Sequence, residues 1–160
     1  MRHPLLVTGC VLGILLSCVG LFAEPLVVTV RVIDARNGKP YRKLRLLVEF
    51  LRAEWSPHGY KTSAEAKANL ISKEVKTTDD KGEVTFSLST PLPGVISVWS
   101  GPMACGAGYF NTHVVMTQGA VGENHCKTKW AKSGIKFQTK PGEIIYFATH
   151  VGLFEGALTK

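Results

Sequence analysis

A strict alternation of apolar and polar residues after a polar turn constrains this sequence more than any other feature. Val84, Phe86 and Leu88 alternate with polar residues, which is the period of a half-buried β-strand. The Asp-Lys-Gly sequence at 80–82 supplies polar side chains and a residue that tolerates a positive φ, as a tight turn requires. We therefore predict that residues 77–88 form a β-hairpin at the centre of the fold.

Similar alternating segments recur along the chain between short turn signals. Asn37-Gly38 and Pro141-Gly142 are dipeptides typical of tight turns, and a long helical period is almost absent. This pattern predicts an all-β fold, an antiparallel β-sandwich of about seven or eight strands with immunoglobulin-like or prealbumin-like architecture. The expected strands cover residues 26–34, 44–51, 70–77, 83–88, 95–99, 109–117, 135–139 and 143–149.

The first 23 residues have the three parts of a secretory signal peptide. A short basic start precedes an apolar run over residues 5–22, and the small residue Ala23 follows it. A transmembrane anchor is the alternative, but the glycines within the run and the strand pattern that begins at Leu26 favour cleavage. We expect a signal peptide over residues 1–23 and a single sandwich domain over residues 24–160.

A second form of processing remains open at Cys18. The sequence Leu-Leu-Ser-Cys at 15–18 resembles the lipobox of bacterial lipoproteins, in which the cysteine is acylated and becomes the new N-terminus. In that case the lipid anchor would be the protein's only attachment to a membrane.

Cys105 and Cys126 are the two cysteines that remain after the signal peptide. An even number of cysteines in an oxidising compartment predicts a disulfide. His113 and His125 lie in the same loop and raise a metal site as the rival interpretation. Because no spacing typical of metal ligands supports that site, we expect no metal and no other cofactor.

Residues 52–68 break the strand pattern. Trp55 and Tyr60 stand among turn residues, and Ser63 is a suitable cap for one or two helical turns. Insertions of this length in a compact domain are commonly functional or mobile. Trp55 and Tyr60 are therefore candidate binding residues; the alternative is that they cover one end of the core.

The formal net charge of +7 raises the question of a nucleic-acid partner. The densest basic run, residues 36–45, lacks the clustering with aromatic or groove-reading residues that nucleic-acid binding needs. Spaced basic residues in an exported β-protein more often protect sheet edges and loops. We expect no nucleic-acid partner and allow weak contact with anionic surface polymers.

Two segments of the first half of the chain resemble known domain families. They resemble the carboxypeptidase regulatory-like and prealbumin-like (transthyretin-like) families. The first segment consists of residues 28–34 followed by Asn37-Gly38-Lys39-Pro40, and the second is the later stretch 78–86. That resemblance implies a sandwich fold and a non-catalytic accessory or adhesive module at a bacterial surface.

Two enzyme families with similar folds offer alternatives. A hydroxyisourate-hydrolase-like enzyme would end in Tyr-Arg-Gly-Ser, whereas this chain ends in Gly-Ala-Leu-Thr-Lys. An intradiol-dioxygenase-like iron site would need a tyrosine where Val84 stands; the remaining residues of the right types are Tyr109, His113, Tyr146 and His150. Within each Tyr/His pair the two residues are four apart in an expected strand and so about 13 Å from each other. We expect no enzymatic activity.

The sequence therefore predicts a non-catalytic exported sandwich module that binds a protein or a surface polymer outside the cytoplasm. A structural component of a surface assembly and a metal-dependent enzyme on a similar sandwich remain the alternatives.

Overall fold

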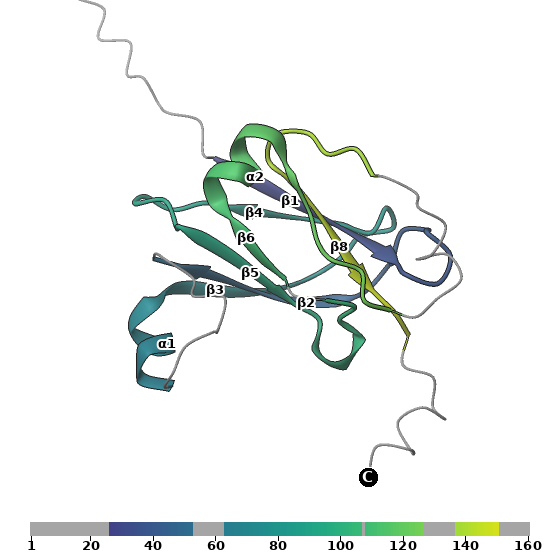
Figure 1. The fold of residues 1–160 in the computed structure, drawn as a ribbon, viewed down its shortest axis with the longest axis horizontal. Helices are drawn as coiled ribbons and strands as arrows, with labels where there is room; N and C mark the ends of the chain where they lie inside the picture. Colours follow the sequence, from purple (N-terminus) through teal and green to yellow (C-terminus); the bar gives the residue numbers. More distant parts are fainter. Residues whose placement is uncertain (1–25, 53–62, 107, 127–136, 151–160) are drawn as a thin grey trace, which may run out of the picture.

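The computed structural model describes residues 26–52, 63–106, 108–126 and 137–150. These residues form two four-stranded sheets packed face to face, so the chain is an all-β sandwich (Figure 1). The elements in chain order are β1 (Val27–Asp34), β2 (Arg45–Leu51), α1 (Ser63–Asn69), β3 (Leu70–Thr77), β4 (Glu83–Ser87), β5 (Val95–Trp99), the 3-10 helix η1 (Gly101–Met103), β6 (Tyr109–Asn111), α2 (Thr112–Gln118), β7 (Ala120–Val121) and β8 (Glu143–Ala148).

The two sheets differ in strand direction. Sheet 2, in the order β3-β2-β5-β6, is antiparallel throughout. Sheet 1, in the order β4-β1-β8-β7, is mixed, because β8 runs parallel to both of its neighbours. The prediction of a purely antiparallel sandwich is therefore wrong for sheet 1. Residues 122–142 connect β7 to β8 and exceed the dozen or so residues that a parallel connection needs.

Residues 77–88 do not form the predicted hairpin. Strand β3 pairs with β2 in sheet 2, whereas β4 pairs with β1 in sheet 1, so the turn between them carries the chain from one sheet to the other. The turn itself has the expected chemistry, since Gly82 has φ +75° and donates its N–H to Asp79 O at 3.1 Å. Alternation specifies which side chains are buried, but it does not specify which strand lies alongside.

The expected strand over residues 109–117 is a strand only as far as Asn111. The Asn111 side chain then accepts a hydrogen bond from Val114 N at 3.2 Å and caps the start of α2. The helix ends at Gly119, which has φ +79°. The described part of the expected strand 135–139, residues 137–139, is also outside any strand.

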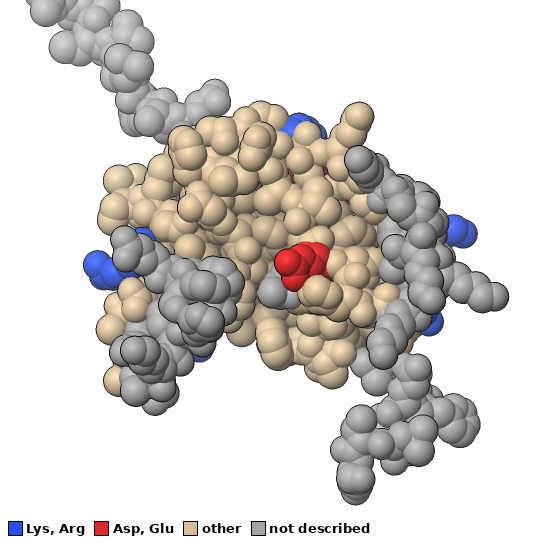
Figure 2. Space-filling view, in the orientation of Figure 1, with Lys and Arg blue, Asp and Glu red and all other residues tan. Residues whose placement is uncertain are grey.

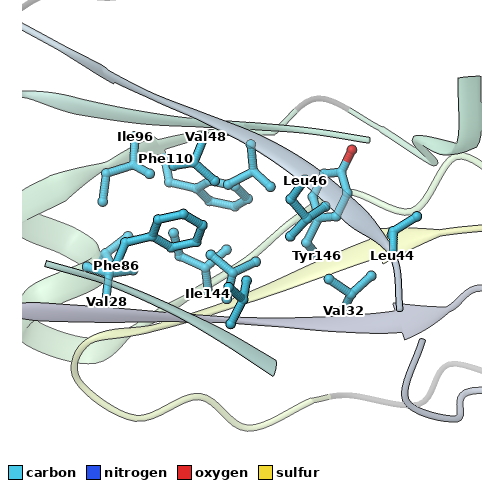
Figure 3. Packing of buried hydrophobic residues seen from close by; sticks show 14 of the residues in the cluster. Val28, Val32, Leu44, Leu46, Val48, Phe86, Ile96, Phe110, Ile144 and Tyr146 are labelled. Atoms are coloured by element: carbon cyan, nitrogen blue, oxygen red, sulfur yellow. The ribbon is translucent and has the colours of Figure 1, made fainter. Parts of the chain in front are cut away.

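The main hydrophobic core lies between the inner faces of the two sheets (Figure 3). Alternate residues of β1 and β2 point into it, as their sequence period predicts. Burying one large apolar side chain in this core stabilises the folded state by about 1.5–3 kcal/mol. The largest fully buried side chains belong to Val28, Val30, Val32, Leu46, Val48, Phe86, Ile96, Val115, Ile144, Ile145 and Tyr146.

A second, smaller apolar cluster covers the outer face of sheet 1. The predicted disulfide between Cys105 and Cys126 is present there, with an S–S distance of 2.02 Å. Cys105 packs with Ile33, Ile145 and Phe147, and Cys126 lies at the margin of the same cluster. Every residue of β8 is buried because apolar groups cover both faces of the strand. Its first residue, Glu143, forms an ion pair with Arg31.

Candidate functional site

Several residues singled out from the sequence lie outside the described part of the chain. Trp55 and Tyr60, the candidate binding residues, belong to this group, as do Cys18 and the whole of residues 1–23. The two ends of the insertion are described: Arg52 donates its backbone N–H to Asn69 O at 2.8 Å. The insertion therefore begins and ends at one place, at the end of β2.

The four residues considered for an iron site lie in different parts of the fold: Tyr109 in β6, His113 in α2, Tyr146 in β8 and His150 after β8. Tyr109 is exposed on β6, whereas Tyr146 on β8 points into the core, where its hydroxyl lies 3.2 Å from Ser100 Oγ. Burial raises the pKa of Tyr146, and the hydrogen bonds with Ser100 offset this only in part. His150 instead contacts Tyr41, through its ring and through a hydrogen bond between Nδ1 and the Tyr41 hydroxyl.

The histidine next to the disulfide, His125, pairs with a glutamate of the same loop. His125 Nε2 lies 2.6 Å from Glu123 Oε2, and both side chains are largely exposed. Within the described ranges no group of three or more His, Cys, Asp and Glu side chains gathers as metal ligands.

The feature that sequence reasoning missed is an uncharged edge of the sandwich, which we define as the surface of residues 92–121. This stretch contains no Asp, Glu, Lys or Arg. Besides the short η1, it forms β5, β6, α2 and β7, so it includes one edge strand of each sheet, β6 and β7, and the helix between them. Helix α2 packs on β6 and β8 and spans the opening between the sheets (Figure 1). Figure 2 views this side: Lys and Arg lie at its margin, and one acidic residue from outside residues 92–121 lies near its centre.

Large apolar side chains are concentrated on the uncharged edge. Trp99 is 58% exposed and Tyr109 is 46% exposed, although both are large aromatic residues. Trp99 lies opposite Leu47 in the β2–β5 pairing, and Leu47 lies opposite Val75 of β3, so an apolar row continues across the outer face of sheet 2. Among the described residues the exposed large apolar side chains are Leu26, Val27, Val75, Leu92, Trp99, Tyr109, Val114 and Val121, of which the last five belong to the uncharged edge.

The opposite edge of the sandwich, formed by β3 and β4, is charged. Lys76 of β3 lies 2.9 Å from Glu74 Oε2 and donates to Thr85 O of β4, also at 2.9 Å. Its ammonium group is 4.7 Å from the centre of the Phe86 ring. A lysine placed across an open strand edge discourages pairing with another chain. The β3–β4 edge therefore carries charged side chains, whereas residues 92–121 expose apolar ones.

A pocket of about 280 Å³ opens on the uncharged edge where β6 runs into α2. Its apolar walls come from Leu92 and Pro93 before β5 and from Met116 on α2. The polar lining residues are Asn111, Thr112 and His113. None of these side chains carries a carboxylate, an ammonium or a guanidinium group. The pocket can therefore hold an uncharged group.

This arrangement suits binding more than catalysis. The centres of protein–protein interfaces are poor in charged residues and rich in aromatic residues and methionine, which matches the uncharged edge. Exposed apolar patches of this kind on a folded domain commonly mark interaction sites. The uninterrupted lack of charge over residues 92–121 was visible in the sequence, but only the fold shows that its four elements share one side of the molecule.

Comparison with known proteins identifies no family. No family model matches the sequence, and no curated protein matches it. One solved structure with a similar fold is the full-length major pilin SpaD from Corynebacterium diphtheriae, with 10% sequence identity and a TM-score of 0.42. The alignment covers 81% of this chain and 33% of the pilin, so the chain spans about a third of the pilin's length. At this identity and TM-score the likeness carries no inference about function.

Neither helix of the described ranges has both the length and the apolar character needed to cross a bilayer.

Proposed function

We propose that this protein is a non-catalytic, extracytoplasmic β-sandwich module that binds another protein through its uncharged edge. The observation that carries the proposal is the one-sided distribution of charge and apolar surface. Residues 92–121 expose Trp99, Tyr109 and Val114 without a charged neighbour in sequence, whereas the opposite edge has Lys76 across its open strand. A protein partner removes such an apolar patch from water at little cost in desolvated charge.

The disulfide supports the extracytoplasmic part of the proposal. Cys105 and Cys126 are bonded, and structural disulfides persist mainly in oxidising compartments. The bond fastens the loop after β7 to the segment between η1 and β6, which lies within residues 92–121, so this region is held in shape before any partner binds. A preformed surface loses less conformational entropy on binding.

Site-specific photo-cross-linking in whole cells tests the proposal. A benzophenone amino acid is placed at Tyr109 or Val114 on the uncharged edge, and at Lys73 or Thr85 on the charged edge as matched controls; all four positions are exposed strand or helix sites. We expect one discrete cross-linked protein from the first pair and none from the second. Equal cross-linking from both edges, or from the charged edge alone, would refute the assignment of the binding surface.

A further inference from the structure

Three side chains that can each offer a lone pair to a metal ion meet next to η1. Met103 Sδ and His150 Nδ1 both contact the hydroxyl of Tyr41, the sulfur at 3.5 Å. The Tyr41 and His150 rings also meet edge to face, with their centres 5.1 Å apart. Met103 and His150 stand 62 and 109 positions after Tyr41 in the chain, so no local motif indicates this cluster.

Backbone hydrogen bonds hold the three residues of the cluster in place. Met103 O accepts a hydrogen bond from Thr149 N at 2.8 Å, which fastens the end of η1 to the residue before His150. Tyr41 N donates to Val32 O of β1 at 2.9 Å. The Tyr41 side chain is 7% exposed, Met103 is half-buried and His150 is exposed. The cluster is therefore preformed by the fold and reached by solvent on the side of His150.

The hydrogen bonds within the cluster do not use all of its lone pairs. Met103 Sδ can only accept a hydrogen bond, and His150 Nδ1 accepts one in one of the two neutral tautomers of imidazole. The Tyr41 hydroxyl has a single proton, so in that tautomer it cannot donate to both atoms. Thioether sulfur is, besides, a weak acceptor. A cation that is coordinated by the sulfur and the nitrogen together would engage both lone pairs.

The donor atoms select a soft ion of low charge. Thioether sulfur favours copper(I), and imidazole also suits copper, whereas calcium and magnesium take oxygen ligands. Burial raises the pKa of Tyr41, and the charge of Asp34 adds to this increase while that of Arg36 opposes it. The phenol therefore stays protonated at pH 7 and supplies no negative charge. A set of uncharged sulfur and nitrogen donors matches a monovalent copper ion.

We propose that Met103 Sδ and His150 Nδ1 bind a copper(I) ion. The Tyr41 hydroxyl gives up its contacts with these two atoms when the ion enters from the exposed side of His150. The ion is bound without any change in its oxidation state. This site goes beyond the proposed function and does not depend on it, because Tyr41 and His150 lie outside the uncharged edge.

Competition for copper tests the proposal on the purified protein with its disulfide intact. Copper(I) is kept reduced with ascorbate in the absence of oxygen, and the protein competes for it with the coloured chelator bicinchoninate. We expect the protein to take one equivalent of copper(I), and X-ray absorption at the copper edge to show a sulfur and a nitrogen neighbour. An excess of Zn²⁺ should leave the copper bound, because zinc in proteins takes thiolate, imidazole and carboxylate ligands. Copper that stays with the chelator, or that Zn²⁺ displaces, would overturn the inference.

A pair of methionine variants locates the sulfur ligand. Met103→Leu conserves the volume of the side chain and removes its sulfur, so we expect the copper(I) affinity to fall about ten-fold or more, since even residues behind a metal ligand commonly change affinity by about 10–100-fold. Met116→Leu is the matched control, because Met116 is also partly buried against the main core. It should keep the affinity of the unaltered protein. Equal affinities of the two variants would contradict the assignment.

Two further variants separate the nitrogen ligand from the phenol. His150→Gln should lower the copper(I) affinity by a factor similar to that of Met103→Leu. Tyr41→Phe removes a hydroxyl that competes with copper for both donor atoms, so this variant should bind copper(I) at least as tightly as the unaltered protein. If Tyr41→Phe retains the melting temperature but loses copper binding, the phenol is the ligand and the assignment to Met103 and His150 is wrong.

Discussion

Asp34 shows how a single residue at the end of β1 holds a turn that the sequence already indicated. Its carboxylate accepts hydrogen bonds from the backbone and guanidinium of Arg36 and from the side chain of Asn37. Burial by itself raises the pKa of Asp34, but these hydrogen bonds and the positive charge of Arg36 outweigh it, so the pKa is lowered. The turn beyond it closes at Gly38, which has φ +73°, as the Asn-Gly dipeptide predicted.

We expect Asp34→Asn to lower the free energy of unfolding by about 1 kcal/mol at pH 7. A carboxylate with a lowered pKa in the folded state stabilises the fold above its unfolded pKa of about 3.9, and this stabilisation is lost as pH falls through the folded value. The difference between Asp34→Asn and the unaltered protein should therefore shrink between pH 4 and pH 2. Urea unfolding at pH 7, 4 and 2 measures it, and a constant difference would contradict the role of the ionised group.

Among the elements, helix α2 and the disulfide are the two features that a simple sandwich of strands does not contain. Residues after Asn111 have an apolar period that suits a strand as well as a helix, and the Asn111 side chain decides between them by capping the helix. The disulfide could be predicted because only two cysteines lie beyond residues 1–23, the expected signal peptide. Its packing on the outer face of sheet 1 could not, because it depends on β8 lying between β1 and β7.

Replacing both cysteines, Cys105→Ser with Cys126→Ser, should lower the free energy of unfolding by about 3 kcal/mol in the chain-entropy treatment, since the bond closes a loop of 21 residues. The buried position of Cys105 adds a smaller packing loss. Urea unfolding of the double variant, beside the unaltered protein with and without reductant, gives the difference. A double variant as stable as the oxidised protein would show that the bond does not stabilise the fold.

For the whole molecule, export remains a prediction from the sequence, since residues 1–23 lie outside the described ranges. We expect the mature protein in an envelope or extracellular fraction to begin at Glu24, and its intact mass gives the cleavage site. Cys18→Ser serves as the control: it should leave both mass and location unchanged. If the variant is instead released from the membrane, Cys18 carries a lipid and the alternative form of processing holds.

The sequence by itself determined the local properties of this protein: the all-β class, the apolar face of most strands, the positive φ at Gly38, Gly82 and Gly142, and the disulfide. These depend on side-chain alternation and on backbone preferences that act within a few residues. Only the tertiary structure decided that β3 and β4 separate into different sheets, that β8 runs parallel to β1, and that the uncharged residues share one edge. The physical reason is that alternation fixes only which face of a strand is buried, and it is the same whichever strand lies alongside. The pairing is selected when both sheets bury their apolar faces together.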